Sequence, residues 1–531
     1  MSRAESLDYR NLPSYKPLFL DYLHRFDALS LFFTGDPFDP ASWGKMATAL
    51  EARVPSPSSA VPLRALNTAL GADALTLRSI DALGDGALAV ITGQQVGLFG
   101  GPLYTLYKAL TTVRLARAAE AELQTKVVPL FWMDTDDHDF AEVQSTWILD
   151  AAYELVELRY DTDDANEKLP VGRRKLAPAI GTVLDEAAAS LPDTEFKEDV
   201  LSTLRESYAA GRTMAEAFGA WLLRMTRGSG LVIVDPSLPE LKALGADVFA
   251  RELEEESESR RLVQQTTAEL VERGYHAQAT PSESHLNLFH ADPVRSPVTV
   301  SGNSDKDELV RRLRDEPSHF SPNVLLRPIY QDTLFPTLAY VAGPNELAYF
   351  AQLKRMYEHF DLTMPLIASR ASFTVVERPQ ARFLDRYDVP LVKLNSDDES
   401  LLNDILRGQT PPQLDEDLKR ARNCIQDITT ALERDLSAVD PSLVPTVKST
   451  RGKLLHHLKE LETKAFRAVK RRHDTVRQQF LATRTALFPD FDMQERKLSP
   501  LGYLNKYGWH FTTMVEERAD PALKAHLLLY P

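Results

Sequence analysis

Five ionisable side chains stand almost side by side in the string DTDDHD, directly after the apolar run VVPLFWM. They are Asp134, Asp136, Asp137, His138 and Asp139. Carboxylates and an imidazole gathered at one point can hold a magnesium ion, orient an amine or remove a proton as a general base. We take Asp137 and His138 as the catalytic pair, with His138 as the general base and a neighbouring carboxylate holding its tautomer and stabilising its charged form. Carboxylates beside a histidine should also favour its protonated form. The alternative is that Asp137 or Asp139 only begins a helix as its N-cap.

A glycine-rich stretch, TGQQVGLFGGP, follows another apolar run, ALAVITG, and precedes a segment with helical periodicity. A strand that leads through such a turn into a helix gathers backbone N–H groups and the positive helix end, which attract phosphates and carboxylates. The spacing is neither that of a P-loop nor that of a dinucleotide fingerprint. In the alternative interpretation the glycines serve only the backbone geometry of a tight turn. We predict an anion or nucleotide site at Gly93, Gly97, Gly100 and Gly101, within reach of Gln94, Gln95, Tyr104 and Lys108.

Further polar residues stand beside apolar runs between positions 331 and 372. Gln331, Asp332, Asn345 and Glu346 occur in LLRPIYQDTLFPTLAYVAGPNE, and Arg370 and Ser372 follow MPLIA. At the edges of strands such residues can orient a substrate, and Arg370 adds a cation for a carboxylate or a phosphate. Each of them could equally be a cap or turn residue, as Asn345 could be an N-cap, and Arg370 could be a surface cation.

The order of the apolar runs predicts the architecture that positions these residues. Strand, helix and strand between Gly86 and Val143 form a βαβ unit, and the same order recurs from Gly230 and from Thr337. This indicates an α/β fold with a Rossmann-type, doubly wound core over residues 1–390. Segments at about 150–225 and 245–320 break the order, and we interpret them as two inserted connecting segments. Since ligands bind at the carboxyl ends of such strands, the aspartate cluster and the glycine-rich stretch should lie together.

Heptad spacing replaces the strand pattern over residues 391–490. Leucine, isoleucine and alanine recur every three or four residues in QLDEDLKRARNCIQDITTALERDL and again from Leu454 to Ala468. Pro441 and Pro445 separate the two stretches, so we predict an antiparallel α-helical coiled coil with a second helix of about 40 residues. Residues 491–531 are aromatic and too short for a domain, and we expect them to pack back on the core.

Composition narrows the classes of function. The chain has 61 basic and 76 acidic residues, and its net charge of −15 argues against a general binder of nucleic acids or anionic membranes. The one cysteine, Cys424, excludes an internal disulfide framework and any zinc site built from two or more cysteines, and we assign no residue as a metal ligand. No stretch of 18 uncharged apolar residues and no apolar leader occurs, so we predict a cytoplasmic enzyme without membrane contact.

Four long strings together resemble one family. TGQQVGLFGGPLYTLYK, PLFWMDTDDHDFAEV, SPNVLLRPIYQDTLFPTLAYVAGPNELAYFAQL and the closing YLNKYG are similar to the cysteine ligase family of bacillithiol biosynthesis, over nearly the full length. The resemblance implies a core like that of class I aminoacyl-tRNA synthetases and a coiled coil that mediates homodimerisation. It implies that cysteine is joined to the amine of glucosaminyl malate with ATP or ADP as the nucleotide, with or without magnesium. We assign Tyr503, Asn505 and Lys506 of the closing string to nucleotide contacts.

Activation of the cysteine carboxyl through an adenylate suits this reaction, because condensing a carboxylate with an amine in water is uphill. Two alternatives stay open: another adenylate-forming enzyme of the same fold, and a non-catalytic nucleotide-binding scaffold. The cluster from Asp134 to Asp139 argues against a scaffold, which gains nothing from four carboxylates and a histidine at the end of a strand.

Overall fold

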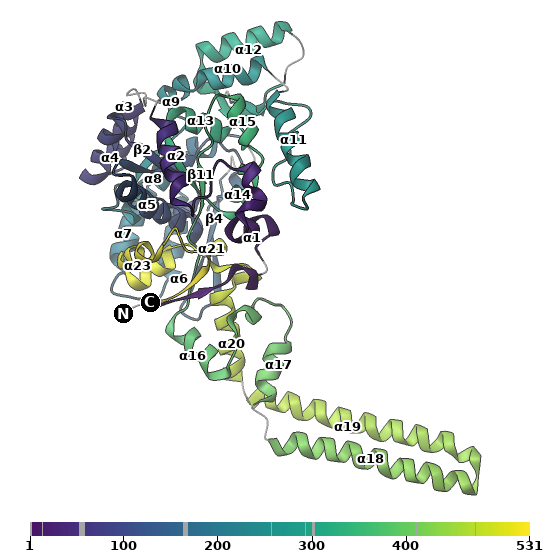
Figure 1. The fold of residues 1–531 in the computed structure, drawn as a ribbon. Helices are drawn as coiled ribbons and strands as arrows, with labels where there is room; N and C mark the ends of the chain where they lie inside the picture. Colours follow the sequence, from purple (N-terminus) through teal and green to yellow (C-terminus); the bar gives the residue numbers. More distant parts are fainter. Residues whose placement is uncertain are drawn as a thin grey trace. The chain divides into compact units, whose positions relative to one another are not determined.

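A parallel sheet of five buried strands carries the site (Figure 1). In the computed structural model the strands are β2 (Leu88–Gln95), β3 (Val127–Asp134), β6 (Val232–Val234), β10 (Thr337–Ala342) and β11 (Leu366–Ser369). Each is an apolar run, which suits a sheet that is covered on both faces. In the order β11-β10-β2-β3-β6, the chain continues from β2 to β3 and β6 on one side of β2. The later strands β10 and β11 lie on the other side of β2. The doubly wound prediction is therefore confirmed, with its topological switch point between β2 and β10.

The structure describes residues 3–12, 14–51, 59–162, 168–255, 258–291, 294–299, 303–408, 412–472 and 474–531. They fall into two units, one of Met1–Val376 with Asp492–Pro531 and one of Glu377–Phe491. Within the described ranges no helix is both long enough and apolar enough to cross a membrane.

Helix α5 (Leu103–Leu123) packs on β2 and β3 and carries two residues of the predicted site. Its N-terminal half is buried almost all round, because α2 (Pro40–Leu50), α21 (Gln494–Lys497) and α23 (His510–Arg518) also contact it. In the C-terminal half of α5, Leu115 belongs to an apolar cluster with Trp43 of α2 and with Val90 and Leu338 of the sheet. Burial of these side chains fixes α5 against the sheet.

Two segments are inserted between the strands of the sheet. Between β3 and β6 lie β4 (Ser145–Leu149), β5 (Leu155–Arg159), α6 (Ile180–Ser190), α7 (Lys197–Ser207) and α8 (Met214–Met225). Between β6 and β10 lie α9 (Pro239–Leu244), α10 (Ala246–Glu254), α11 (Glu258–Glu272), β7 (Leu288–Ala291), β8 (Arg295–Pro297), α12 (Asn303–Asp315), β9 (Phe320–Pro322) and α13 (Arg327–Leu334). The strands β4 and β5 form a hairpin, and β8, β7 and β9 form a small antiparallel sheet.

Both ends of the chain join the first unit. Strand β13 (His526–Tyr530) pairs antiparallel with β1 (Arg3–Leu7) and parallel with β12 (Phe373–Val375). The remaining helices of this unit are α1 (Pro17–His24), α3 (Ala60–Ala69), α4 (Ala74–Gly84), α14 (Pro344–Phe350), α15 (Lys354–His359) and α22 (Leu501–Tyr507).

The second unit contains the coiled coil. Helices α18 (Pro412–Val439) and α19 (Val444–Arg472) run antiparallel on either side of a short turn at Pro441–Leu443 (Figure 1). Arg451 Nη2 lies 2.6 Å from Glu433 Oε2 across the pair. The stretch predicted as one helix of about 40 residues is described as α19 and α20 (Asp474–Leu487), and residue 473 lies outside the described residues. Helices α16 (Arg378–Tyr387) and α17 (Ser400–Arg407) complete this unit.

Candidate functional site

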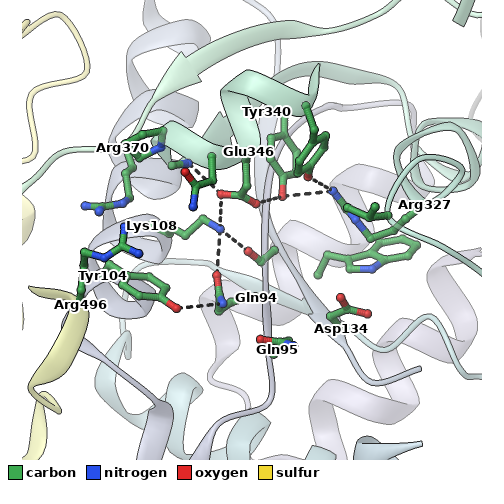
Figure 2. A pocket seen from close by; sticks show the side chains of 17 residues that line it. Gln94, Gln95, Tyr104, Lys108, Asp134, Arg327, Tyr340, Glu346, Arg370 and Arg496 are labelled. Carbon is green, nitrogen blue, oxygen red and sulfur yellow. Dashed lines mark hydrogen bonds and ion pairs between the residues drawn. The ribbon is translucent and has the colours of Figure 1, made fainter. Parts of the chain in front are cut away.

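A pocket of about 260 Å³ opens at the switch point, at the carboxyl ends of β2, β3 and β10 (Figure 2). This is where a doubly wound sheet binds its ligands. The pocket brings together eight of the residues predicted for the site and leaves the others outside. The lining residues are Gly93, Gln94, Gln95, Tyr104, Lys108, Trp132, Asp134, Val324, Arg327, Tyr340, Gly343, Pro344, Asn345, Glu346, Tyr349, Arg370 and Arg496.

An ion pair between Lys108 and Glu346 lies on the pocket wall, with 2.5 Å between Nζ and Oε2 (Figure 2). Glu346 also accepts hydrogen bonds from the Tyr340 hydroxyl and the Gly343 amide, both at 2.8 Å. The second of these bonds closes a capping box, since Glu346 is the third residue of α14. Burial lowers the pKa of Lys108 below its ordinary value, although the charge of Glu346 acts in the opposite sense. The pair is therefore a fixed unit with little net charge.

Gly343, and not Asn345, is the N-cap of α14. The prediction of an N-cap at Asn345 is wrong, because the helix already begins at Pro344, a residue suited to the first helical position. Asn345 instead lies in the first turn of the helix and lines the pocket.

Arg327 is a buried cation of the pocket that the sequence analysis did not assign. Its side chain donates hydrogen bonds to the hydroxyls of Tyr349 (2.7 Å) and Tyr340 (3.5 Å) and to the side-chain oxygen of Gln331 (3.0 Å). In the part of the chain that the structure describes, no carboxylate forms an ion pair with it. Burial disfavours its charge, but the neighbouring tyrosines and the carboxylates of Asp134 and Glu346 favour it and hold the pKa of Arg327 well above its ordinary value. Because no carboxylate forms an ion pair with Arg327 within the described residues, an anionic group of a ligand should bind most favourably at this residue.

Gln331 and Asp332 lie behind Arg327 and outside the pocket. The prediction placed them at the edge of a strand, but both are on α13 and are at most 1 % exposed. Asp332 accepts hydrogen bonds from Gln331 at 2.9 Å, from the Thr337 hydroxyl at 2.6 Å and from Tyr357. Their side chains position the helix that carries Arg327, so the prediction of direct substrate contacts is wrong in this arrangement.

Arg370 lines the pocket, but its charge is already neutralised. Its guanidinium forms two hydrogen bonds with the buried carboxylate of Glu495, at 2.9 and 2.6 Å. Ser372 lies behind the pocket, where its hydroxyl contacts Glu495 at 2.8 Å and His526 Nδ1 at 2.7 Å. Arg496 is a more accessible cation of the wall, with Asp492 at 3.5 Å.

The two glutamines and the tyrosine of the glycine-rich stretch are connected to this wall (Figure 2). Gln94 contacts the Tyr104 hydroxyl at 3.2 Å and accepts a hydrogen bond from Lys108 at 3.1 Å. Gln95 donates to the carboxylates of Asp137 (2.6 Å) and Glu142 (2.8 Å). Gln95 therefore joins the pocket to the loop that follows β3.

The glycine-rich turn itself is filled by the protein. The amide of Gly100 donates to the Tyr208 hydroxyl at 3.1 Å, and the first amide of α5, that of Leu103, donates to the Leu498 carbonyl at 2.8 Å. Gly100 has a φ of +90°, and a Cβ there would lie 3.0 Å from Trp221. Gly97, Gly100 and Gly101 therefore serve turn geometry and packing, and only Gly93 reaches the pocket. The structure therefore does not support the predicted anion site at this turn.

The loop with Asp137 and His138 lies beside the pocket, and neither residue lines it. Asp137 accepts hydrogen bonds from Gln95 and from the amide of His138 at 2.7 Å. Arg295, from β8, donates to His138 Nδ1 at 3.1 Å, which leaves the proton of the neutral ring on Nε2. Burial and the charge of Arg295 lower the pKa of His138, although Asp137 acts in the opposite sense. The expectation of a favoured protonated form is wrong, because burial, and after it the charge of Arg295, lower the pKa of His138 more than Asp137 raises it.

Two further aspartates of the string DTDDHD, Asp136 and Asp134, differ sharply in their surroundings. Asp136 is buried against Lys242, with 2.5 Å between Oδ2 and Nζ. Asp134, the last residue of β3, lines the pocket and forms no hydrogen bond or ion pair within the described ranges (Figure 2). Burial and the charge of Asp137 raise the pKa of Asp134 to about 6.

The residues assigned from YLNKYG lie on or near α22, away from this pocket. Tyr503 and Lys506 border a cavity of about 10 Å³ with Ile148 and Leu498. Asn505 is fully buried and donates to the Pro192 carbonyl at 2.9 Å. The structure therefore does not bring them together with the residues of the switch-point pocket.

The donor set of the pocket suits anions and an amine. Arg327 and Arg496 could hold phosphate or carboxylate oxygens, as a nucleotide or an acidic substrate requires. Over the described ranges, no group of three or more histidine, cysteine, aspartate or glutamate side chains is placed to hold a metal ion.

The sequence analysis missed Arg327, Tyr340, Tyr349 and Arg496 as pocket residues. Three of them occur in or beside the string LLRPIYQDTLFPTLAYVAGPNE, so the correct segment was identified, but not the residues that face the pocket. A helical pattern for RPIYQDTL would have placed Arg327 one turn from Gln331, on the same face.

Comparison with known proteins agrees with this arrangement. Residues 3–371 match the family model described as "Bacillithiol biosynthesis BshC, N-terminal Rossmann-like domain", and residues 373–531 match its "C-terminal coiled-coil domain". Proteins that carry the name "Putative cysteine ligase BshC" are similar over most of their length. The one from Salinibacter ruber is 35% identical, covering 93% of each chain, and that from Koribacter versatilis is 33% identical, covering 94% of each. The chain therefore belongs to the BshC family of bacillithiol biosynthesis.

Proposed function

We propose that this chain is a ligase that joins the carboxyl group of cysteine to the amine of glucosaminyl malate, after a nucleotide has activated the carboxyl. The observation that carries the proposal is a pair of charged groups in the switch-point pocket that form no ion pair with any described residue, the guanidinium of Arg327 and the carboxylate of Asp134. Glucosaminyl malate has carboxylates and an amine, and these are the groups that Arg327 and Asp134 complement.

Each group contributes in a different way. Arg327 is held in place by Tyr349 and Gln331, so its remaining N–H groups are oriented before a ligand binds. Such preorganisation strengthens a charge-assisted bond to a carboxylate. Arg496 and Gln94 line the same pocket and can contact the activated carboxyl or its phosphate. ATP supplies the activation, and its phosphates are the second kind of anion that this pocket suits.

The coiled coil supports a proposal about assembly. Ile428, Leu432, Leu454 and Leu461 are each more than 40 % exposed on α18 and α19. Apolar side chains at heptad positions are usually covered by another helix. The chain forms a homodimer through these faces.

The test of the ligase is direct synthesis. The full-length protein is incubated with cysteine, glucosaminyl malate, ATP and magnesium, and the amide product and the nucleotide product are measured by mass spectrometry. We expect both products, and a loss of at least tenfold in kcat/KM for Arg327→Gln. The matched control is Arg114→Gln, at an exposed position of α5 outside the pocket, which should leave kcat/KM unchanged. Absence of both products from the parent protein would refute the proposal.

A further inference from the structure

Most carboxylates in and around the pocket already have partners. Glu346 is paired with Lys108 and accepts two further hydrogen bonds. Glu495 is held by Arg370 and Asp136 by Lys242. These groups are fixed by their partners, so a substrate amine would have to displace a buried cation to reach them.

Asp137 and His138 are engaged as well. The carboxylate of Asp137 accepts hydrogen bonds from Gln95 and from the backbone amide of His138. His138 Nδ1 accepts a hydrogen bond from Arg295, which leaves this ring no free lone pair for a proton. Asp134 is therefore the carboxylate of the described pocket wall whose oxygens are free for a ligand.

We infer that Asp134 receives the amino group of glucosaminyl malate and accepts the proton that this amine loses when it attacks the activated cysteine. The inference rests on the proposed function and replaces the predicted role of His138. Asp134 stands at the end of β3, and Arg327, on α13, lines the same pocket. One ligand with an amine and a carboxylate can then contact both residues at once.

The step balances without any further reactant. The amine nitrogen forms a C–N bond to the carbonyl carbon of cysteine, which is joined to a phosphate or nucleotide in a mixed anhydride. The bond from that carbon to the phosphate oxygen breaks, and the phosphate or nucleotide leaves with the electron pair. The N–H proton moves to a carboxylate oxygen of Asp134 and from there to water.

The charges around Asp134 suit this role. Burial and the charge of Asp137 raise its pKa to about 6, and Asp136 acts in the same sense. Arg327 and Arg295 act in the opposite sense and prevent a larger shift. A base is most effective when its pKa lies near the working pH. Asp134 is thus mostly ionised at pH 7 and still basic enough to accept a proton.

Binding of glucosaminyl malate tests the amine contact without any turnover. Calorimetry between pH 5 and pH 7 should show affinity for the parent protein rising about tenfold, as a carboxyl of pKa about 6 ionises. Asp134→Asn should remove this rise, and so should the N-acetylated substrate with the parent protein. Asp139→Asn is the matched control, because Asp139 is exposed and outside the pocket, and it should keep the rise. Equal pH dependence in the parent and Asp134→Asn would overturn the inference, as would a rise seen with cysteine in place of glucosaminyl malate.

Turnover tests the proton transfer. Asp134→Asn should lower kcat by about 10²–10⁴ and remove the decline of the parent's rate below pH 6, with little change in KM for cysteine. Because Asp134 bonds to no described residue, the nearly isosteric Asn should leave the fold intact, which tryptophan fluorescence can verify. A variant within threefold of the parent would refute the base role while the ligase function stands. If the parent protein forms no product, this result counts against the ligase function. The binding measurement then still decides whether Asp134 contacts the substrate amine.

Discussion

Neutralising Glu495 should destabilise the first unit far more than neutralising a surface glutamate with the same geometry. The carboxylate of Glu495 is 1 % exposed and accepts hydrogen bonds from both terminal nitrogens of Arg370, from Ser372 and from the amide of Phe373. Glu495→Gln keeps the shape but leaves the arginine charge buried without a partner. Breaking one side of a buried pair costs about 3–5 kcal/mol. We expect a loss of that size in the free energy of unfolding.

The assay follows from the distribution of tryptophan. All five tryptophans belong to the first unit, so their fluorescence in a urea titration reports that unit's unfolding: Trp43, Trp132, Trp147, Trp221 and Trp509. The control is Glu258→Gln, which breaks a two-bond pair with Arg261 on the surface of α11. That change should leave the urea midpoint almost unchanged, because exposed pairs contribute little to stability.

A double variant sharpens the comparison. Replacing both Arg370 and Glu495 by leucine removes the two charges together, so it should be less destabilised than either single replacement. Equal losses for Glu495→Gln and Glu258→Gln, or a double variant that is the least stable of all, would refute the account of a buried and mutually dependent pair.

Three other properties can be checked by simple measurements. Burial lowers the pKa of His526 to about 4 from 6.5, so the unfolded chain binds more protons between these values. The first unit should therefore lose up to about 1.4 kcal/mol per pH unit as pH falls from 6.5 to 4, and His526→Gln should flatten this slope in urea titrations. Gly100→Ala should cost about 1–3 kcal/mol in the same titrations, because a Cβ there meets Trp221 and the φ is positive. Leu454→Glu with Leu461→Glu should raise the dimer dissociation constant at least 100-fold in sedimentation, with unchanged helix content by circular dichroism.

The strands and the place of the pocket followed from the sequence, because both depend on local pattern. Each of β2, β3, β10 and β11 is a continuous apolar run, and the rule for parallel sheets then placed the pocket at their carboxyl ends. Lys108 and Glu346 could be predicted as pocket residues for the same reason, since each lies within the first two turns of a helix that follows such a strand.

The errors arose where partners distant in the sequence decide the outcome. Burial, and after it the charge of Arg295, which is 157 residues away in the sequence, lower the pKa of His138, whereas the adjacent aspartates alone would raise it. Tyr208 and Leu498 occupy the amides of the glycine-rich turn, and no local spacing reveals them. The sequence shows which charged residues stand near a site, but not which of them form ion pairs with one another in the folded protein.

The same consideration explains why Arg327 and Asp134 carry the functional argument. Lys108, Arg370 and Lys242 each have a carboxylate within hydrogen-bonding distance, so their charges are balanced by the fold itself. Arg327 and Asp134 lack such a partner within the described residues, and the fold leaves these two opposite charges on one pocket wall without pairing them. The two charges act on each other through space, but each gains a direct ion-pair partner only when a ligand supplies an anion to Arg327 and an amine to Asp134. A ligand with only one of these groups would leave one charge uncompensated, so the pocket should discriminate in favour of substrates that carry both.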